Sequence, residues 1–270
     1  MQSSWPKKKE KGRFHLENKF VFAKTIVKEA GDYILEHMKE DLHVERKSSP
    51  TDLVTKLDKD VQDLLIEKIH SRYPNDLFCA EEGCLRAAVG QGSVWVIDPI
   101  DGTNNFVAQG EDFAVMVAYF ENGVGKFGII YDVMKGDFYH GGGDFPPCCN
   151  DEPLPPFKKK PLREFLVAGN SGMLETNEWG LADLGNAALG TRVYGSASIS
   201  FAKVLSGRLL TYISYLQPWD YAAASILGES LGYKVLTIAG KEVDFHTRQA
   251  VMMVPVEMQD EIQSYVYERK

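Results

Sequence analysis

The chain has 270 residues, of which 44% are hydrophobic and 25% are charged, and it carries a net charge of −8. Those values are ordinary for a globular protein built as one large domain or two packed ones, with enough apolar residues to form a core without disulfides. The acidic balance argues against sequence-independent nucleic-acid binding, which needs a basic surface, but it leaves anionic small molecules open because bound divalent cations can invert the local charge.

The N-terminal part of the chain predicts two helices. Residues 1–16 show no hydrophobic periodicity, so we expect a disordered extension there. From Glu17 to about Met38, apolar residues recur at three- and four-residue steps, which is the pattern of an amphipathic helix. A second helix is expected between Asp58, which suits the N-cap, and Tyr73, which precedes a proline.

The rest of the chain alternates between strand-like and helix-like segments. Runs rich in β-branched and aromatic residues predict strands at 94–97, 113–120, 126–133, 165–168, 192–194, 208–213, 235–238 and 250–254. Helical patterns occupy 176–188, 196–205, 219–231 and the end of the chain from about residue 256. Residues 141–161 are dense in Gly and Pro and predict a boundary or long connection. We therefore expect an α+β half over residues 17–150 and an α/β half over residues 151–270.

The start of the chain and its cysteines predict the compartment. The first residues are polar and basic, without the apolar segment of a secretory signal, and no run of 18 apolar residues is present. Cys148 and Cys149 are neighbours, which is a poor arrangement for a structural disulfide, and the four cysteines do not have zinc-site spacing. We expect free thiols in a cytoplasmic protein that does not enter a membrane.

The segment from Asp98 to Thr103 carries the strongest chemical signal. It places two carboxylates three residues apart where a strand ends, with a proline between them that turns the chain. Asp98, Asp101 and the carbonyl of Ile100 can then converge as hard oxygen ligands, which suit Mg²⁺ or Mn²⁺. Gly102 allows close backbone approach, and its N–H and that of Thr103 can face a phosphate. A simple Asp-Pro turn with a capping acid is the alternative that this segment alone leaves open.

Other polar residues are weak signals on their own. Glu81 is the first of two adjacent acids after an apolar run, and such a pair is usually solvated surface. Asp220 starts a predicted helix, where capping alone explains an acid. Thr55 and Asp58 can form a local helix cap.

In combination, these stretches resemble the inositol monophosphatase family of lithium-sensitive, metal-dependent phosphatases. The matching segments, in family order and spacing, are 47–55 (Lys-Ser-Ser-Pro-Thr-Asp-Leu-Val-Thr), 81–82 (Glu-Glu), 98–106, 195–197 (Gly-Ser-Ala) and 219–220 (Trp-Asp). They span the chain from about residue 17 to its end. The resemblance implies a layered αβαβα sandwich, with the site between its two halves.

The resemblance also implies a metal-assisted hydrolysis of phosphate monoesters. Glu81, Asp98 and the Ile100 carbonyl would hold one Mg²⁺. Asp98, Asp101 and Asp220 would hold a second, with Asp98 bridging the two. A third, weaker ion would lie near Glu81, and Mn²⁺ could replace Mg²⁺. Two-metal sites of this kind activate a water and stabilise the leaving oxygen.

Further residues take catalytic and substrate roles by the same resemblance. Glu81 would act through its metal, and Thr103, paired with Asp52, would orient and deprotonate the attacking water. The N–H groups of Gly102 and Thr103 would receive the phosphate. Substrate contacts are further expected at Lys47, Gly195, Ser196 and Ile213.

One position departs from the family pattern and bears on the substrate. Ile213 stands where animal enzymes have a Glu that touches the inositol hydroxyls, and loss of such a hydrogen bond weakens recognition by about 1–3 kcal/mol. Inositol 1-phosphate is still the first substrate expected, with the 2′-phosphate of NADP(H), fructose 1,6-bisphosphate and 3′,5′-bisphosphonucleotides as alternatives. A non-catalytic regulatory homologue is the alternative of a different class, and the retained carboxylates argue against it. A homodimer is implied by analogy with relatives.

Overall fold

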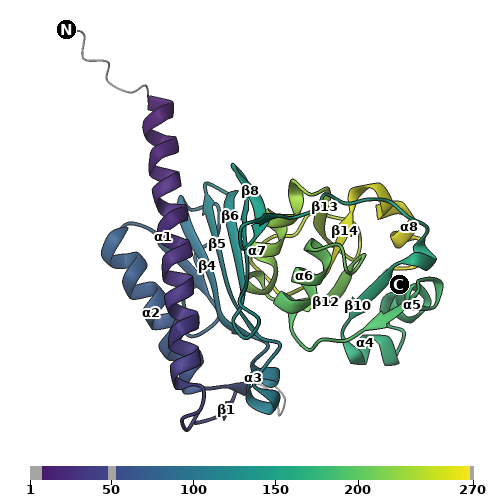
Figure 1. Ribbon diagram of the computed structural model, residues 1–270. Coiled ribbons are helices and arrows are strands. Elements are labelled where there is room, and N and C mark those ends of the chain that lie inside the picture. Colours follow the sequence, from purple (N-terminus) through teal and green to yellow (C-terminus); the bar gives the residue numbers. More distant parts are fainter. Residues whose placement is uncertain (1–7, 48–52, 268–270) are drawn as a thin grey trace.

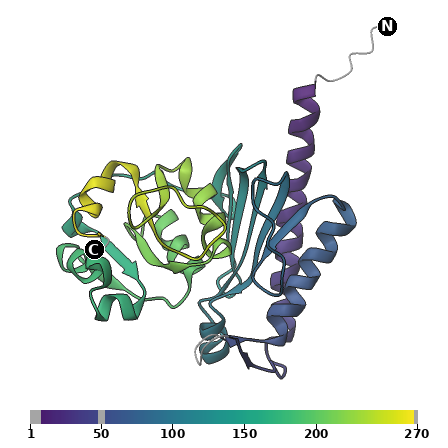
Figure 2. The same ribbon diagram turned by 180° about the vertical axis from the view of Figure 1, so that it is seen from behind.

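The computed structural model describes residues 8–47 and 53–267 (Figure 1, and from behind in Figure 2). The helices are α1 (Lys8–His37), α2 (Lys56–Arg72), α3 (Thr103–Gln109), α4 (Ser171–Glu175), α5 (Leu181–Ala187), α6 (Ala197–Leu205), α7 (Pro218–Glu229) and α8 (Gln259–Gln263). Short 3₁₀ turns lie at Leu162–Glu164, Glu178–Gly180 and Val256–Met258.

The strands of the first half are β1 (Glu45–Arg46), β2 (Leu53–Val54), β3 (Leu77–Ala80), β4 (Ser93–Asp101), β5 (Ala114–Glu121), β6 (Val124–Asp132), β7 (Asp137–Gly142), β8 (Phe145–Cys149) and β9 (Glu152–Pro153). Those of the second half are β10 (Leu166–Gly169), β11 (Gly190–Arg192), β12 (Tyr212–Leu216), β13 (Tyr233–Thr237) and β14 (Gln249–Pro255).

Two large sheets alternate with three layers of helices. Within the described residues, β3 to β9 form a seven-stranded sheet in sequence order, and a five-stranded sheet has the order β11-β10-β12-β14-β13. The pair α1 and α2 covers one face of the first sheet, α6 and α7 lie between the sheets, and α4, α5 and α8 cover the far face of the second (Figure 1). The αβαβα sandwich implied by the family resemblance is confirmed.

Helix α1 begins earlier than the sequence predicts. Its first residue is Lys8, so the expected disordered extension is wrong for residues 8–16, while residues 1–7 lie outside the described part of the chain. Arg13 and Glu17 form an i,i+4 ion pair, and Leu16 is already buried in the core. The first turns project beyond the sheet in Figure 1, so they need no apolar face and show no periodicity. Their Lys and Glu residues favour helix by intrinsic propensity.

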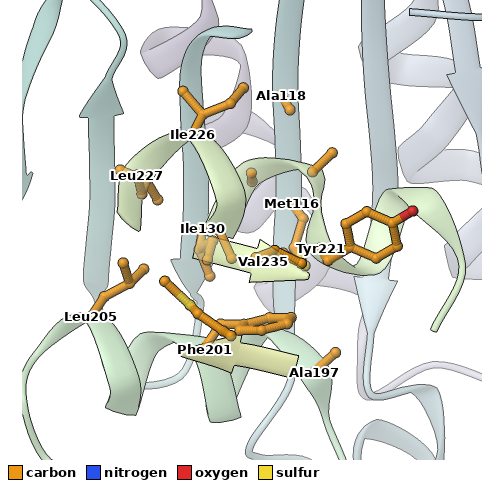
Figure 3. Close-up of a cluster of buried hydrophobic side chains, with 14 of the residues drawn as sticks. Met116, Ala118, Ile130, Ala197, Phe201, Leu205, Tyr221, Ile226, Leu227 and Val235 are labelled. Atoms are coloured by element: carbon orange, nitrogen blue, oxygen red, sulfur yellow. The ribbon is translucent and has the colours of Figure 1, made fainter. Parts of the chain in front are cut away.

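The central helical layer joins the two halves. Figure 3 shows Phe201 and Leu205 of α6 and Leu227 of α7 in one apolar cluster with Met116 of β5 and Val235 of β13. This cluster contacts the inner faces of both sheets and contains fully buried aromatic rings. The two halves are therefore packed as one body, and residues at their seam hold fixed relative positions.

Several predicted boundaries differ from the observed ones. The Gly- and Pro-rich segment 141–161 contains β8 and β9 as well as a connection. Proline is tolerated there because Pro146 and Pro147 lie where the register between β7 and β8 shifts, and Pro153 lies in the edge strand β9. The strand expected at 208–213 lies at Tyr212–Leu216, because the N–H groups of Arg208 and Leu209 donate to the Lys203 carbonyl at the end of α6 instead of to a neighbouring strand. None of the helices in the described residues is long and apolar enough to cross a membrane.

Candidate active site

Asp98 and Asp101 lie where β4 becomes irregular. Residues three apart in a regular strand point to opposite faces of the sheet. Here Asp98 is opposite Met116 and Asp101 is opposite Ala114, so three steps along β4 match two along β5. This bulge brings both carboxylates to the same side, as the sequence motif predicts.

Asp220 reaches the same point from the second half of the molecule. It is the third residue of α7, and its Oδ2 accepts the backbone N–H of Gln217 at 2.8 Å in a capping box. One oxygen from each of Asp98, Asp101 and Asp220 lies within 4.8 Å of the others. The helix start therefore holds this carboxylate against the two acids of β4.

Glu81 emerges beside Asp98. It follows β3, which runs parallel to β4 with Ala80 opposite Ile97, and its N–H donates to the Ile97 carbonyl at 3.1 Å. Burial raises the pKa of Glu81 to about 7, although the nearby Lys47 ammonium opposes the rise. The carboxyl therefore gains a proton more readily than an exposed Glu.

Negative charge is concentrated where Asp98, Asp101 and Asp220 converge. Burial first, and then the neighbouring negative charges, raise the pKa of both Asp98 and Asp220 well above the usual range. The Oδ1 atom of Asp98 is buried and has no hydrogen-bond partner among the described residues. Crowded carboxylates with a free buried oxygen suit a hard divalent cation, so these residues fit the Mg²⁺ implied by the family.

Lys47 contacts acids at the edge of this cluster. Its Nζ lies 2.8 Å from Glu81 Oε1, and it also pairs with Glu82. The ammonium partly neutralises Glu81 in the metal-free protein. A contact of Lys47 with substrate stays a prediction.

The hydroxyl of Thr103 contacts Asp58, an acid that the sequence did not assign to the site. This hydroxyl lies 3.1 Å from Asp58 Oδ1 and 3.1 Å from the Ile100 carbonyl. Asp52, the partner expected for Thr103, lies outside the described residues. Asp58 was expected as the N-cap of α2, but Thr55 is the N-cap, and Asp58 accepts the Thr55 N–H through Oδ2 at 2.8 Å.

The capping geometry explains why Asp58 reaches the site. One oxygen closes the capping box and the other remains available to Thr103. The Thr55-x-x-Asp58 pattern identifies this acid as part of a helix cap. Nothing in the sequence indicates that it contacts Thr103, which lies 45 residues further along the chain. Only the packing of α2 against the first sheet does so.

Two glycines allow the loop between β4 and α3 to contact the second half. Gly102 has φ of 91°, and a Cβ there would lie 2.9 Å from the Cβ of Ser196. Gly195 has φ of 72°, and a Cβ there would lie 2.6 Å from Oδ1 of Asn105. Both backbone conformations favour glycine. Gly195 and Ser196 are therefore packed directly against this loop, and their contact with substrate stays a prediction.

Ile213 does not line an open pocket, so its expected place in the substrate site is corrected. Its side chain is 0% exposed and packs in the apolar cluster between the second sheet and α4, α5 and α8. Its neighbour Tyr212 faces the opposite cluster, as alternation along β12 requires. The sequence position matched the family, but the strand turns this side chain away from the acidic cluster.

The fold and the carboxylate cluster at its seam define a metal-dependent phosphatase. The chain belongs to the inositol monophosphatase family, whose model matches residues 15–269. Its enzymes hydrolyse phosphate monoesters.

Individual relatives match most of the chain. An inositol-1-monophosphatase of Bacillus subtilis is 39% identical over 236 residues, covering 85% of this chain and 89% of that protein. The crystal structure of inositol monophosphatase II from Staphylococcus aureus MSSA476 has a TM-score of 0.84 at 30% identity, covering 92% of this chain and 93% of the other. A structure described as IMPase/NADP phosphatase complexed with Mg²⁺ and phosphate shares the fold, with a TM-score of 0.86 at 24% identity and coverage of 93% and 95%.

Proposed function

We propose that this phosphatase uses two or three Mg²⁺ ions, or Mn²⁺ in their place, to hydrolyse a small phosphorylated metabolite, with inositol 1-phosphate as the first substrate. The observation that carries the proposal is the convergence of Glu81, Asp98, Asp101 and Asp220 from both halves of the molecule. When bound, the metal supplies activation of the attacking water and neutralises charge on the phosphoryl group.

Asp58 and Thr103 are placed to handle the proton of that water. The Thr103 hydroxyl can donate to Asp58 Oδ1, which leaves the hydroxyl oxygen free to accept a hydrogen bond from water. Burial raises the pKa of Asp58, which makes its carboxylate a better base than an exposed Asp. This pair takes the role that the resemblance gave to Thr103 and Asp52.

The start of α3 supplies the phosphate contacts of the proposal. Gly102 precedes the helix and, among the residues that the structure describes, no side chain caps its first turn. The N–H groups of Gly102 and Thr103 follow Asp101 directly, so an anion bound there would lie beside the metal ligands. Because glycine has no Cβ, an anion can approach the backbone closely at this position.

A second substrate class, the 2′-phosphate of NADP(H), is favoured by one observation. A protein of the same fold is described as IMPase/NADP phosphatase. Fructose 1,6-bisphosphate and 3′,5′-bisphosphonucleotides are the remaining candidate substrates to compare.

The test is phosphate release with Mg²⁺, ranked by kcat/KM across these substrates. The proposal expects inositol 1-phosphate to rank first, loss of activity with a chelator, and inhibition by Li⁺. A higher kcat/KM for NADP would transfer the assignment to the second class. No release from any of them would favour a regulatory homologue. Sedimentation of the same sample would test the homodimer expected from relatives.

A further inference from the structure

The two oxygens of the Asp101 carboxylate have different surroundings. Oδ2 accepts the Ser196 hydroxyl at 2.5 Å, the Ser198 hydroxyl at 2.5 Å and the Ser198 N–H at 2.7 Å. Oδ1 accepts one long contact, from the Ala197 N–H at 3.3 Å. A carboxylate oxygen has room for about two good hydrogen bonds, so Oδ2 is saturated and Oδ1 keeps its capacity for a cation.

Ser198 supplies two of the three donors on Oδ2. The Ser196 hydroxyl has a second task, because it caps α6 by accepting the Ile199 N–H at 3.2 Å. Ser198 is fully buried, and within the described chain its hydroxyl contacts only Asp101 and, at 2.9 Å, Ser196. Helix capping therefore does not explain the Ser198 hydroxyl, whereas the orientation of Asp101 does.

This contact also joins the two halves of the molecule at the metal cluster. Asp101 ends β4 of the first half, and Ser198 lies in the first turn of α6 in the second. Charge-assisted hydrogen bonds to a carboxylate are short and strong, and partners behind a metal ligand commonly change metal affinity 10- to 100-fold. The cluster would lose its fixed ligand orientation without them.

We propose that Ser198 is a positioning residue that holds Asp101 Oδ2, so that Oδ1 is the oxygen presented to the divalent cation. The inference rests on the proposed metal-dependent function. It concerns a hydroxyl of this chain that belongs to no metal ligand and contacts no reacting atom. Ser198→Ala removes one donor while the Ser198 N–H and the Ser196 hydroxyl remain.

The test is Mg²⁺ binding to the full chain, measured by calorimetry without substrate. Ser198→Ala is expected to weaken Mg²⁺ binding about 10-fold or more. Ser200→Ala is the matched control, since it removes a buried hydroxyl from the same helix that donates to the Ser196 carbonyl at 2.7 Å. Both variants should melt alike without metal, and only Ser198→Ala should show a smaller rise in Tm with Mg²⁺.

Equal Mg²⁺ affinity in Ser198→Ala and Ser200→Ala would overturn the positioning role while leaving the proposed function intact. A parent protein that binds no Mg²⁺ would overturn both. If Ser198→Ala does not fold, Ser198→Cys keeps a weaker donor on a slightly larger side chain, and it should lose affinity in the same direction. An unchanged affinity in Ser198→Cys would then refute the proposal.

Discussion

The metal-free protein should become more stable when Glu81 is replaced by Gln. The ordinary pKa of a Glu is 4.5, and in the folded protein that of Glu81 is about 7, chiefly because of burial. Between these values the folded state binds the proton and the unfolded state does not, so stability falls as pH rises from 4.5 to 7. Above pH 7 the Glu81 carboxylate is ionised in both states, and the loss of stability has reached its full size.

The size of this loss of folding stability follows from the change in the pKa of Glu81. A rise from 4.5 to about 7 corresponds to about 3 kcal/mol, because one pKa unit is about 1.4 kcal/mol. The side chain is 21% exposed, so this is an upper bound. In a chain of this size, such a gain would raise Tm by as much as about 5–10 °C at pH 8.

The assay is thermal unfolding with a chelator at pH 5 and pH 8. Glu81→Gln should exceed the parent in Tm at pH 8 and match it near pH 5, where the parent carboxyl is largely protonated. With saturating Mg²⁺ the order should reverse, since the variant lacks a metal ligand.

Glu82→Gln is the matched control for Glu81→Gln. Glu82 shares the Lys47 ion pair, and its backbone is held by Gln62. A Glu81→Gln variant that is no more stable at pH 8 than Glu82→Gln would refute the conclusion that burial of the Glu81 carboxylate destabilises the protein.

Three further substitutions test the site and the core. Asp101→Asn should lower kcat by about 10²-fold or more with little change in Tm, because it weakens a metal ligand at equal volume; activity within a few-fold of the parent would place the metals elsewhere. Ile213→Glu should lower stability by more than about 3 kcal/mol in a denaturation titration, because it buries an unpaired carboxylate; a stable variant with a lower KM for inositol 1-phosphate would restore Ile213 to the pocket. Lys19→Met should lower the free energy of unfolding by about 3 kcal/mol, because it leaves Asp76 buried without its cation. The exposed control Lys28→Met should change it by no more than about 0.5 kcal/mol, and equal effects of the two substitutions would contradict the prediction.

The contrast between Asp220 and Ile213 shows what sequence could and could not predict about the site. Asp220 was placed from its position at the start of a helix and from the family pattern, and it lies in the acidic cluster. Ile213 was placed by the same pattern, but a strand presents alternate residues to opposite faces. Which face of β12 lies toward the acidic cluster depends on how the second sheet packs.

The sequence by itself determined the family and, through the family resemblance, the layered fold. It also predicted Asp98, Asp101 and Asp220, which lie together in the structure, because each belongs to a short family motif at a strand end or helix start. Tertiary structure alone decided which partners hold those acids. Asp58 meets Thr103, and Ser198 meets Asp101, across large separations in the chain. Such contacts leave no periodic or local signal, because they are set by the packing of α2 and α6 against the first sheet.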